Sequence, residues 1–187
     1  MYKNQIGMNL RSIKLVEYNP FWADIFDFNK KRIGKILHNF DFNIHHVGST
    51  AIPTIEKTKP IIDILIGIGN VNDIQSASEI IAERGLYEKG DAFIAKQSSQ
   101  GNRMMVNKVN NPNIVFNFIH LFIPDSLQYN DMLLFKRYLL EHPQEALKYF
   151  RLKSKLSECC PHDITSYTEG KINFVKRINK QAKELYH

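Results

Sequence analysis

Residues 61–68, with the sequence IIDILIGI, constrain the fold of this chain more than any other stretch. A strand formed here would have apolar side chains on both faces, which predicts a position in the middle of a sheet that is covered on both sides. The acid in this run is Asp63. An ionised carboxylate is costly there unless a cation, a metal or several donors meet it. We therefore expect a functional role for Asp63; a salt bridge to Lys59 or to a later arginine is the structural alternative.

The segment before this strand ends in a small polar turn. An apolar run from residue 44 leads into Gly48, Ser49 and Thr50. A glycine lets the backbone approach a ligand closely, and backbone amides in such a turn suit phosphate, especially where a helix begins. A phosphate-binding turn followed one strand later by an acid is the minimal set for a metal–nucleotide complex. A plain turn, which uses the same residue types, is the alternative.

Residues 45–68, HHVGSTAIPTIEKTKPIIDILIGI, resemble the signature of the GrpB family, which is assigned to the nucleotidyltransferase superfamily. The superfamily pattern is Gly-Ser, a gap, and then Asp-x-Asp or Asp-x-Glu on the next strand. Gly48, Ser49 and Asp63 match it, whereas Leu65 occupies the position of the second acid, as is characteristic of GrpB-like chains. The resemblance implies a nucleotidyltransferase-like fold, with Asp63 as catalytic residue and as ligand of a tentative Mg²⁺ or Mn²⁺.

Two hypotheses of function follow from these residues. The first is an enzyme that transfers a nucleotidyl or related phosphoryl group to an unknown small acceptor. The second is a nucleotidyltransferase fold without catalysis, which binds a nucleotide or anionic metabolite as a regulatory module. The matching Gly48, Ser49 and Asp63 favour the first, and the missing second acid favours the second because a two-metal transfer site needs at least two carboxylates.

Five further residues are candidates for ligand binding: His46, Lys59, Arg103, His120 and Lys171. The first two flank the turn and the acid in the family signature, and Arg103 enters a strand just after a polar loop. A polar packing role is the alternative for His46, and an exposed salt bridge is the alternative for Arg103. His120 matches a histidine that GrpB-like chains carry on a late strand; a core histidine is the alternative. Lys171 matches their Tyr-x-x-x-Lys spacing, and we expect it to point at the ligand phosphates or at Asp63. A lysine that only extends to solvent is the alternative there.

The predicted elements alternate between strands and helices. Apolar periodicity, helix-start signals and turn residues predict strands at 42–47, 61–68 and 113–123, a hairpin-like region at 86–109, and helices beginning at residues 20, 72, 126, 143 and about 165, the last extending to about 186. The fold class is therefore α+β, with a mixed sheet of about five strands, flanking helices and a C-terminal helical bundle. We expect one domain over residues 1–187.

Composition restricts the partners. The net charge of +6 favours a nucleotide or another anionic small molecule, and no block of five or more Lys and Arg residues indicates a nucleic-acid arm. No stretch approaches the roughly eighteen apolar residues of a membrane span. The start of the chain lacks an apolar signal core, so we expect a cytoplasmic location. The adjacent Cys159 and Cys160 are expected to be reduced thiols.

Overall fold

The computed structural model describes residues 6–9, 12–86, 90–97, 103–109 and 114–186, with only the backbone described for 90–97, 103–109 and Ile114. Its main sheet has the order β3 (Phe42–Val47), β5 (Ile62–Ile68), β8 (Ile114–Phe122), β7 (Arg103–Val109) and β6 (Gly90–Gln97), and β1 (Met8–Asn9) also pairs with β8. β5 and β8 are parallel and the other pairs are antiparallel. The predicted mixed sheet and α+β class are confirmed.

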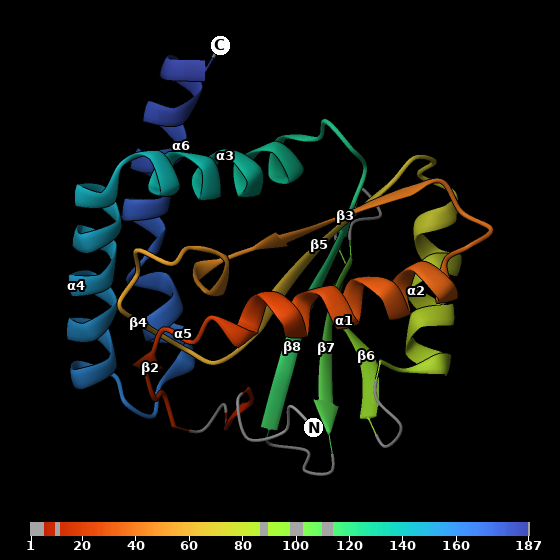
Figure 1. Cartoon of the computed structure of the whole chain (residues 1–187), viewed down its shortest axis with the longest axis horizontal. Helices are drawn as coiled ribbons and strands as arrows, with labels where there is room; N and C mark the ends of the chain where they lie inside the picture. The colour runs from red at the N-terminus through yellow and green to blue at the C-terminus, as the bar shows by residue number, and fades with distance from the viewer. Residues whose placement is uncertain (1–5, 10–11, 87–89, 98–102, 110–113, 187) are drawn as a thin grey trace.

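Two helices cover one face of this sheet. α1 (Phe21–Ile36) crosses the sheet and α2 (Asp73–Arg84) lies toward the β6 side (Figure 1). The even-numbered isoleucines of β5 from Ile62 to Ile68 are buried in one core with residues of both helices, among them Trp22, Ile25, Ile74 and Ile81. Because successive side chains of a strand point to opposite faces, Asp63 and Leu65 lie on the other face.

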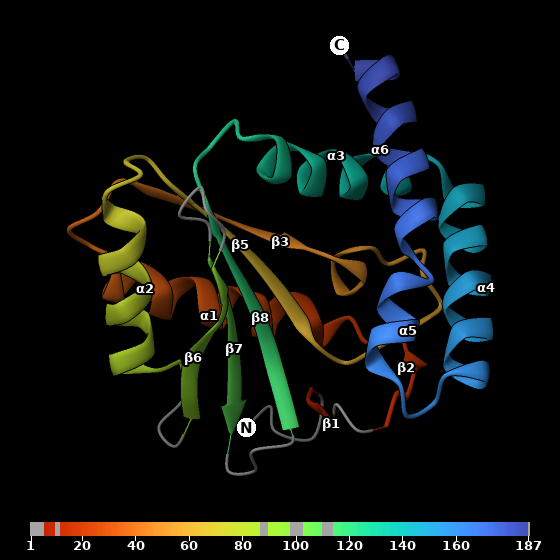
Figure 2. The same ribbon diagram turned by 180° about the vertical axis from the view of Figure 1, so that it is seen from behind.

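Near that other face, α3 (Leu127–Glu141) packs against β3 and β5. The helices α4 (Pro143–Cys159), α5 (Ile164–Glu169) and α6 (Ile172–Tyr186) stand beside the sheet (Figure 2). Leu65 packs with Val47 and with Tyr129 of α3. A separate core joins α3, α4 and α6 to Ile52 and Ile55, which follow the short 3₁₀ helix η1 (Ser49–Ala51). No helix in the described part of the chain is long and apolar enough to cross a membrane.

The prediction of one continuous last helix from about residue 165 to 186 is wrong. α5 ends at Glu169 and α6 begins at Ile172, with Gly170 and Lys171 between them. Asp163 starts α5, since its side chain accepts hydrogen bonds from the amides of Thr165 and Ser166, both at 3.0 Å. α5 is therefore a separate short helix with its own cap. Because the chain breaks before α6, Lys171 lies between the two helices.

Candidate functional site

The pairing of β3 with β5 brings the Gly-Ser turn to the acid. Val47 pairs with Asp63 in this antiparallel ladder, so Gly48 lies beside the carboxylate as the chain leaves β3. Gly48 has φ 70° and ψ −173°, a conformation that is essentially restricted to glycine. A Cβ atom added to Gly48 would be 2.1 Å from Oδ2 of Asp63. Both the backbone conformation and the contact with Asp63 therefore require glycine here.

Hydrogen bonds of Thr50 and His46 hold the turn against β5. The Thr50 side chain is buried, and its hydroxyl donates to the carbonyl of Ile61 at 3.2 Å. Nε2 of His46 is 3.0 Å from the same hydroxyl oxygen and therefore donates to it, while the ring stacks on Phe26. Burial, helped by the nearby Lys136, lowers the pKa of His46 to about 4, so the ring is neutral at pH 7.

The turn and the acid form part of a cavity of about 750 Å³. The sheet supplies Asp63, Phe118 and His120, the turn supplies Gly48, Ser49 and Thr50, and the remaining walls come from the loop before β5 and from α3 to α6. The side chain of Asp63 is 27% exposed. The carboxylate is therefore only partly buried, although the sequence predicted a strand that is covered on both sides. Asp63 sits near the start of β5, where the sheet borders this cavity.

His120 lies next to Asp63 on the neighbouring strand. In the parallel pairing of β5 with β8, Asp63 pairs with Phe118 and Leu65 pairs with His120. Nε2 of His120 is 3.6 Å from Oδ1 of Asp63, which is an ion pair when the imidazole is protonated. The histidine side chain is 17% exposed and its ring stacks on Phe122. The cavity thus contains a carboxylate and an imidazole side by side.

Lys59 and Lys171 reach the cavity from segments that are distant in the sequence. The Nζ atoms of Lys59 and Lys171 lie 5.0 Å and 4.6 Å from the ring centroid of Tyr167. Burial lowers the pKa of Lys59, and the opposing attraction of Asp63 is smaller. Burial and the charge of Lys59 lower the pKa of Lys171 to about 8. The sequence predicted Lys171 in the middle of a helix, but it lies in the break between α5 and α6.

Three functional candidates were missed by the sequence analysis: Tyr149 and Lys153 of α4 and Tyr167 of α5. Tyr149 shares a hydrogen bond with Ser49, and burial raises its pKa. Lys153 is only 2% exposed, and its Nζ donates to the carbonyl of Lys57 at 3.2 Å. Ala146, Tyr149 and Lys153 are spaced as one helix face, so a lysine on an apolar face was the available signal.

The candidate Arg103 is placed only in part. Its backbone begins β7 and pairs with Leu121 of β8, while its side chain lies outside the described residues. The role proposed for Arg103 from the sequence therefore stays a prediction.

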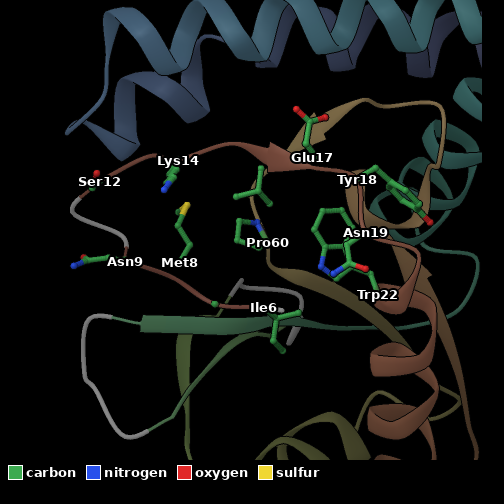
Figure 3. A pocket seen from close by; sticks show the side chains of 12 residues that line it. Ile6, Met8, Asn9, Ser12, Lys14, Glu17, Tyr18, Asn19, Trp22 and Pro60 are labelled. Carbon is green, nitrogen blue, oxygen red and sulfur yellow. The ribbon is translucent and has the colours of Figure 1, made fainter. Parts of the chain in front are cut away.

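A second cavity, of about 740 Å³, lies beside the N-terminal strands (Figure 3). Its lining comes from residues around β1 and β2 (Val16–Glu17), from the start of α1 and from Pro60. It contains none of the residues that the sequence nominated, and its one acid, Glu17, is paired with Lys57 of β4 (Lys57–Thr58) at 2.8 Å. The cavity around Asp63 is therefore the candidate functional site.

The donor set of this site does not fit a metal centre built by the protein. Among the described residues, no group of three or more His, Cys, Asp and Glu side chains could hold a metal ion. Leu65, on the same face of β5 as Asp63, is fully buried in the apolar cluster of Val47 and Tyr129. A two-metal site for nucleotidyl transfer needs bridging carboxylates, and among the described side chains of the sheet Asp63 is the carboxylate that lines this cavity.

Comparisons with known proteins identify a matching family model and related sequences. The family model described as GrpB protein matches residues 12–181. UPF0157 protein YqkA from Bacillus subtilis (strain 168) is 31% identical over 173 residues, which make up 92% of this chain and 48% of that protein. This chain therefore spans about half the length of that relative.

Solved structures show the same architecture. The crystal structure of conserved protein GrpB from Enterococcus faecalis matches with a TM-score of 0.79 at 26% identity, over 92% of this chain and 99% of that one. Terminal uridylyl transferase 4 from Trypanosoma brucei, with bound UTP and UMP, matches with a TM-score of 0.53 at 11% identity, over 89% and 56% of the two chains. The fold is therefore similar to that of nucleotidyltransferases.

Proposed function

Because this chain belongs to the GrpB family and has a nucleotidyltransferase-like fold, we propose that its cavity binds a phosphorylated small molecule, with a nucleoside triphosphate as the first candidate. One observation carries the proposal: the Gly48–Ser49 turn, the Asp63 carboxylate and the ammonium groups of Lys59 and Lys171 line the same cavity. Lysine binds phosphate as a point charge, and the turn lets a ligand approach the backbone. A cavity of this volume is within the usual range for small-molecule sites.

A Mg²⁺ or Mn²⁺ ion belongs to this proposal only as a companion of the ligand. Mg²⁺ keeps several of its waters and is often bound through one or two carboxylates together with substrate phosphates. Asp63 is the residue that would meet such an ion. His46 and Thr50 then act indirectly, because their hydrogen bonds hold the turn that the phosphates approach.

Nucleotidyl transfer is the second candidate, and the fit of Gly48 onto Asp63 favours it. In such a step an acceptor oxygen attacks the α-phosphorus, the bond to the β-phosphate oxygen breaks, and pyrophosphate leaves. We expect binding without turnover, since Leu65 replaces the second carboxylate. Release of pyrophosphate that depends on Asp63 would establish transfer in its place.

The proposal is tested by thermal melting of the full chain with ATP, GTP, CTP or UTP, each with Mg²⁺, with Mn²⁺ and with EDTA. A ligand present at a hundredfold excess over its Kd stabilises the folded state by ~2.7 kcal/mol. We expect a shift with at least one nucleotide. The Asp63→Asn variant should lose the metal-dependent part of the shift, whereas Asp27→Asn on the exposed side of α1 should keep it. Flat curves for all four nucleotides in all conditions contradict the proposal.

A further inference from the structure

Lys59, Lys153 and Lys171 form a lysine trio around two tyrosines at the helical side of the cavity. Lys59 and Lys171 lie over the ring of Tyr167, and Nζ of Lys153 lies 5.1 Å from the ring centroid of Tyr149. The three lysines come from the loop before β5, from α4 and from the junction of α5 with α6. Segments that are far apart in the sequence thus bring three lysine side chains to one place.

This arrangement is costly in the free protein. Burial lowers the pKa of all three lysines, and the charge of Lys59 lowers the pKa of Lys153 and Lys171 further. Asp63 attracts all three, but it is a single carboxylate. Crowded lysines that are buried or partly buried either lose their protons or keep them because an anion compensates their charge. When all three lysines are protonated, they outnumber the two carboxylates that line the cavity, Asp63 and Glu169.

Tyr167 adds a second, independent sign of a ligand. The residue is fully buried and lines the cavity, and its hydroxyl has no hydrogen-bond partner among the described residues. A buried hydroxyl without a partner costs free energy, because it has lost its hydrogen bonds to water. An anionic oxygen bound among the lysines and within reach of this hydroxyl would accept a hydrogen bond from it.

We propose that the lysine trio binds a multiply charged anionic group, such as a diphosphate or triphosphate, directly and without a divalent metal ion. The inference rests on the proposed function, because it requires the cavity to be a ligand site, and it adds the part that the trio plays. Where a two-metal site neutralises phosphate charge with ions held by carboxylates, this cavity places three lysines around Asp63, and its second acid, Glu169, is exposed. The negative charge of such a group favours the protonated form of all three lysines.

Calorimetric titration of the full chain with inorganic tripolyphosphate tests this, in EDTA and in Mg²⁺. We expect binding in EDTA, without any requirement for Mg²⁺, because the lysines contact the phosphate oxygens directly. Lys171→Met and Lys153→Met keep the aliphatic stem and delete the charge, and each should weaken binding about tenfold or more. Lys180→Met and Lys155→Met, at exposed positions of α6 and α4, are the matched controls and should bind as the wild type does.

Proton uptake distinguishes binding at the lysine trio from nonspecific attraction of an anion to the protein surface. The bound anion favours the charged lysines, so binding near pH 8 should take up protons, visible as a heat that depends on the ionisation enthalpy of the buffer. The other titratable groups that line this cavity are Asp63, His120, Tyr149, Tyr167 and Glu169. Loss of the uptake in Lys171→Met assigns it to the trio.

Each remaining outcome decides between this inference and the proposed function. Tripolyphosphate or nucleotide binding that requires Mg²⁺ overturns the inference and leaves the proposed function standing. Equal loss of binding in the trio variants and in the matched controls, or no loss in either, also overturns the inference. Absence of binding by tripolyphosphate and by all four nucleotides, with or without metal, overturns both.

Discussion

At Gly48, the backbone conformation and the contact with Asp63 both exclude any other residue. In Gly48→Ala, the Cβ atom would collide with the carboxylate, and alanine would hold a conformation that costs about 1–3 kcal/mol. We expect a fall of at least that size in the free energy of unfolding, together with loss of ligand binding because Asp63 is displaced. Urea denaturation and the melting shift measure the two effects.

Gly34 supplies the control for this substitution. It lies inside α1, and a Cβ atom there would meet only Cζ of Phe42, at 3.9 Å. Gly34→Ala should therefore raise the free energy of unfolding by up to about 1 kcal/mol, the usual preference of a helix for alanine. A Gly48→Ala variant as stable as Gly34→Ala would show that the turn is not fitted to Asp63.

The lowered pKa of Lys171 makes a prediction about pH. Its pKa is 10.5 in the unfolded chain and about 8 in the folded one, so between these values the unfolded chain binds more protons. The free energy of unfolding of the ligand-free protein should therefore increase as pH rises from 8 to 10.5 and decrease as pH falls over the same range. Affinity for an anion should change in the opposite direction, because the protonated lysine binds the anion.

Urea denaturation of the wild type and of Lys171→Met across pH 7.5–10 measures this contribution. The variant lacks the titrating group, so its free energy of unfolding should depend less on pH than that of the wild type. Parallel pH profiles for the two proteins would mean that Lys171 titrates in the folded state as a surface lysine does.

At the scale of elements, α5 determines where Tyr167 lies. It is a helix of six residues, which depends on its capping residue and its packing more than on intrinsic helix propensity. Asp163 caps it, and at its other end Gly170 packs against Leu156 of α4, where a Cβ atom would be 2.4 Å from Cδ2. Lys171 follows at once, so the cap and this contact also help to place the lysine.

Removing the cap should therefore weaken the site as well as the fold. Asp163→Ala is expected to lower the free energy of unfolding by about 1 kcal/mol and to reduce tripolyphosphate affinity, because Tyr167 loses its fixed position. Urea denaturation and calorimetry measure the two. Ser126 precedes α3 without a side-chain capping bond, so Ser126→Ala should change neither. Unaltered affinity in Asp163→Ala would separate α5 from the ligand.

At the scale of the whole molecule, the strands and the family could be read from local pattern. The predicted strand at 42–47 is β3, the run at 61–68 contains β5, and the GrpB family predicted from residues 45–68 is confirmed. Strand patterns are local, because alternating or continuous apolar side chains decide which faces are buried. The break before α6 was not predicted, since the apolar spacing continues across Gly170.

The site was predictable only on its sheet side. Gly48 and Asp63 lie close together because adjacent strands pair in register, which the sequence order suggests. Lys153 and Tyr167 reach the same cavity because α4 and α5 pack against the loop before β5, and such packing between distant segments leaves no local pattern. Lys153, on the same face of α4 as Ala146 and Tyr149, was the one local indication, but a lysine there is equally consistent with a side chain that extends to solvent.

A crystal structure of the full chain with the nucleoside triphosphate that gives the largest melting shift tests the central claim most directly. The account predicts that the phosphates lie in the cavity beside the Gly48–Ser49 turn, within hydrogen-bonding distance of at least two lysines of the trio. A nucleotide bound elsewhere, such as in the cavity beside Trp22 and Pro60, or a cavity without nucleotide at saturating concentration, would contradict it.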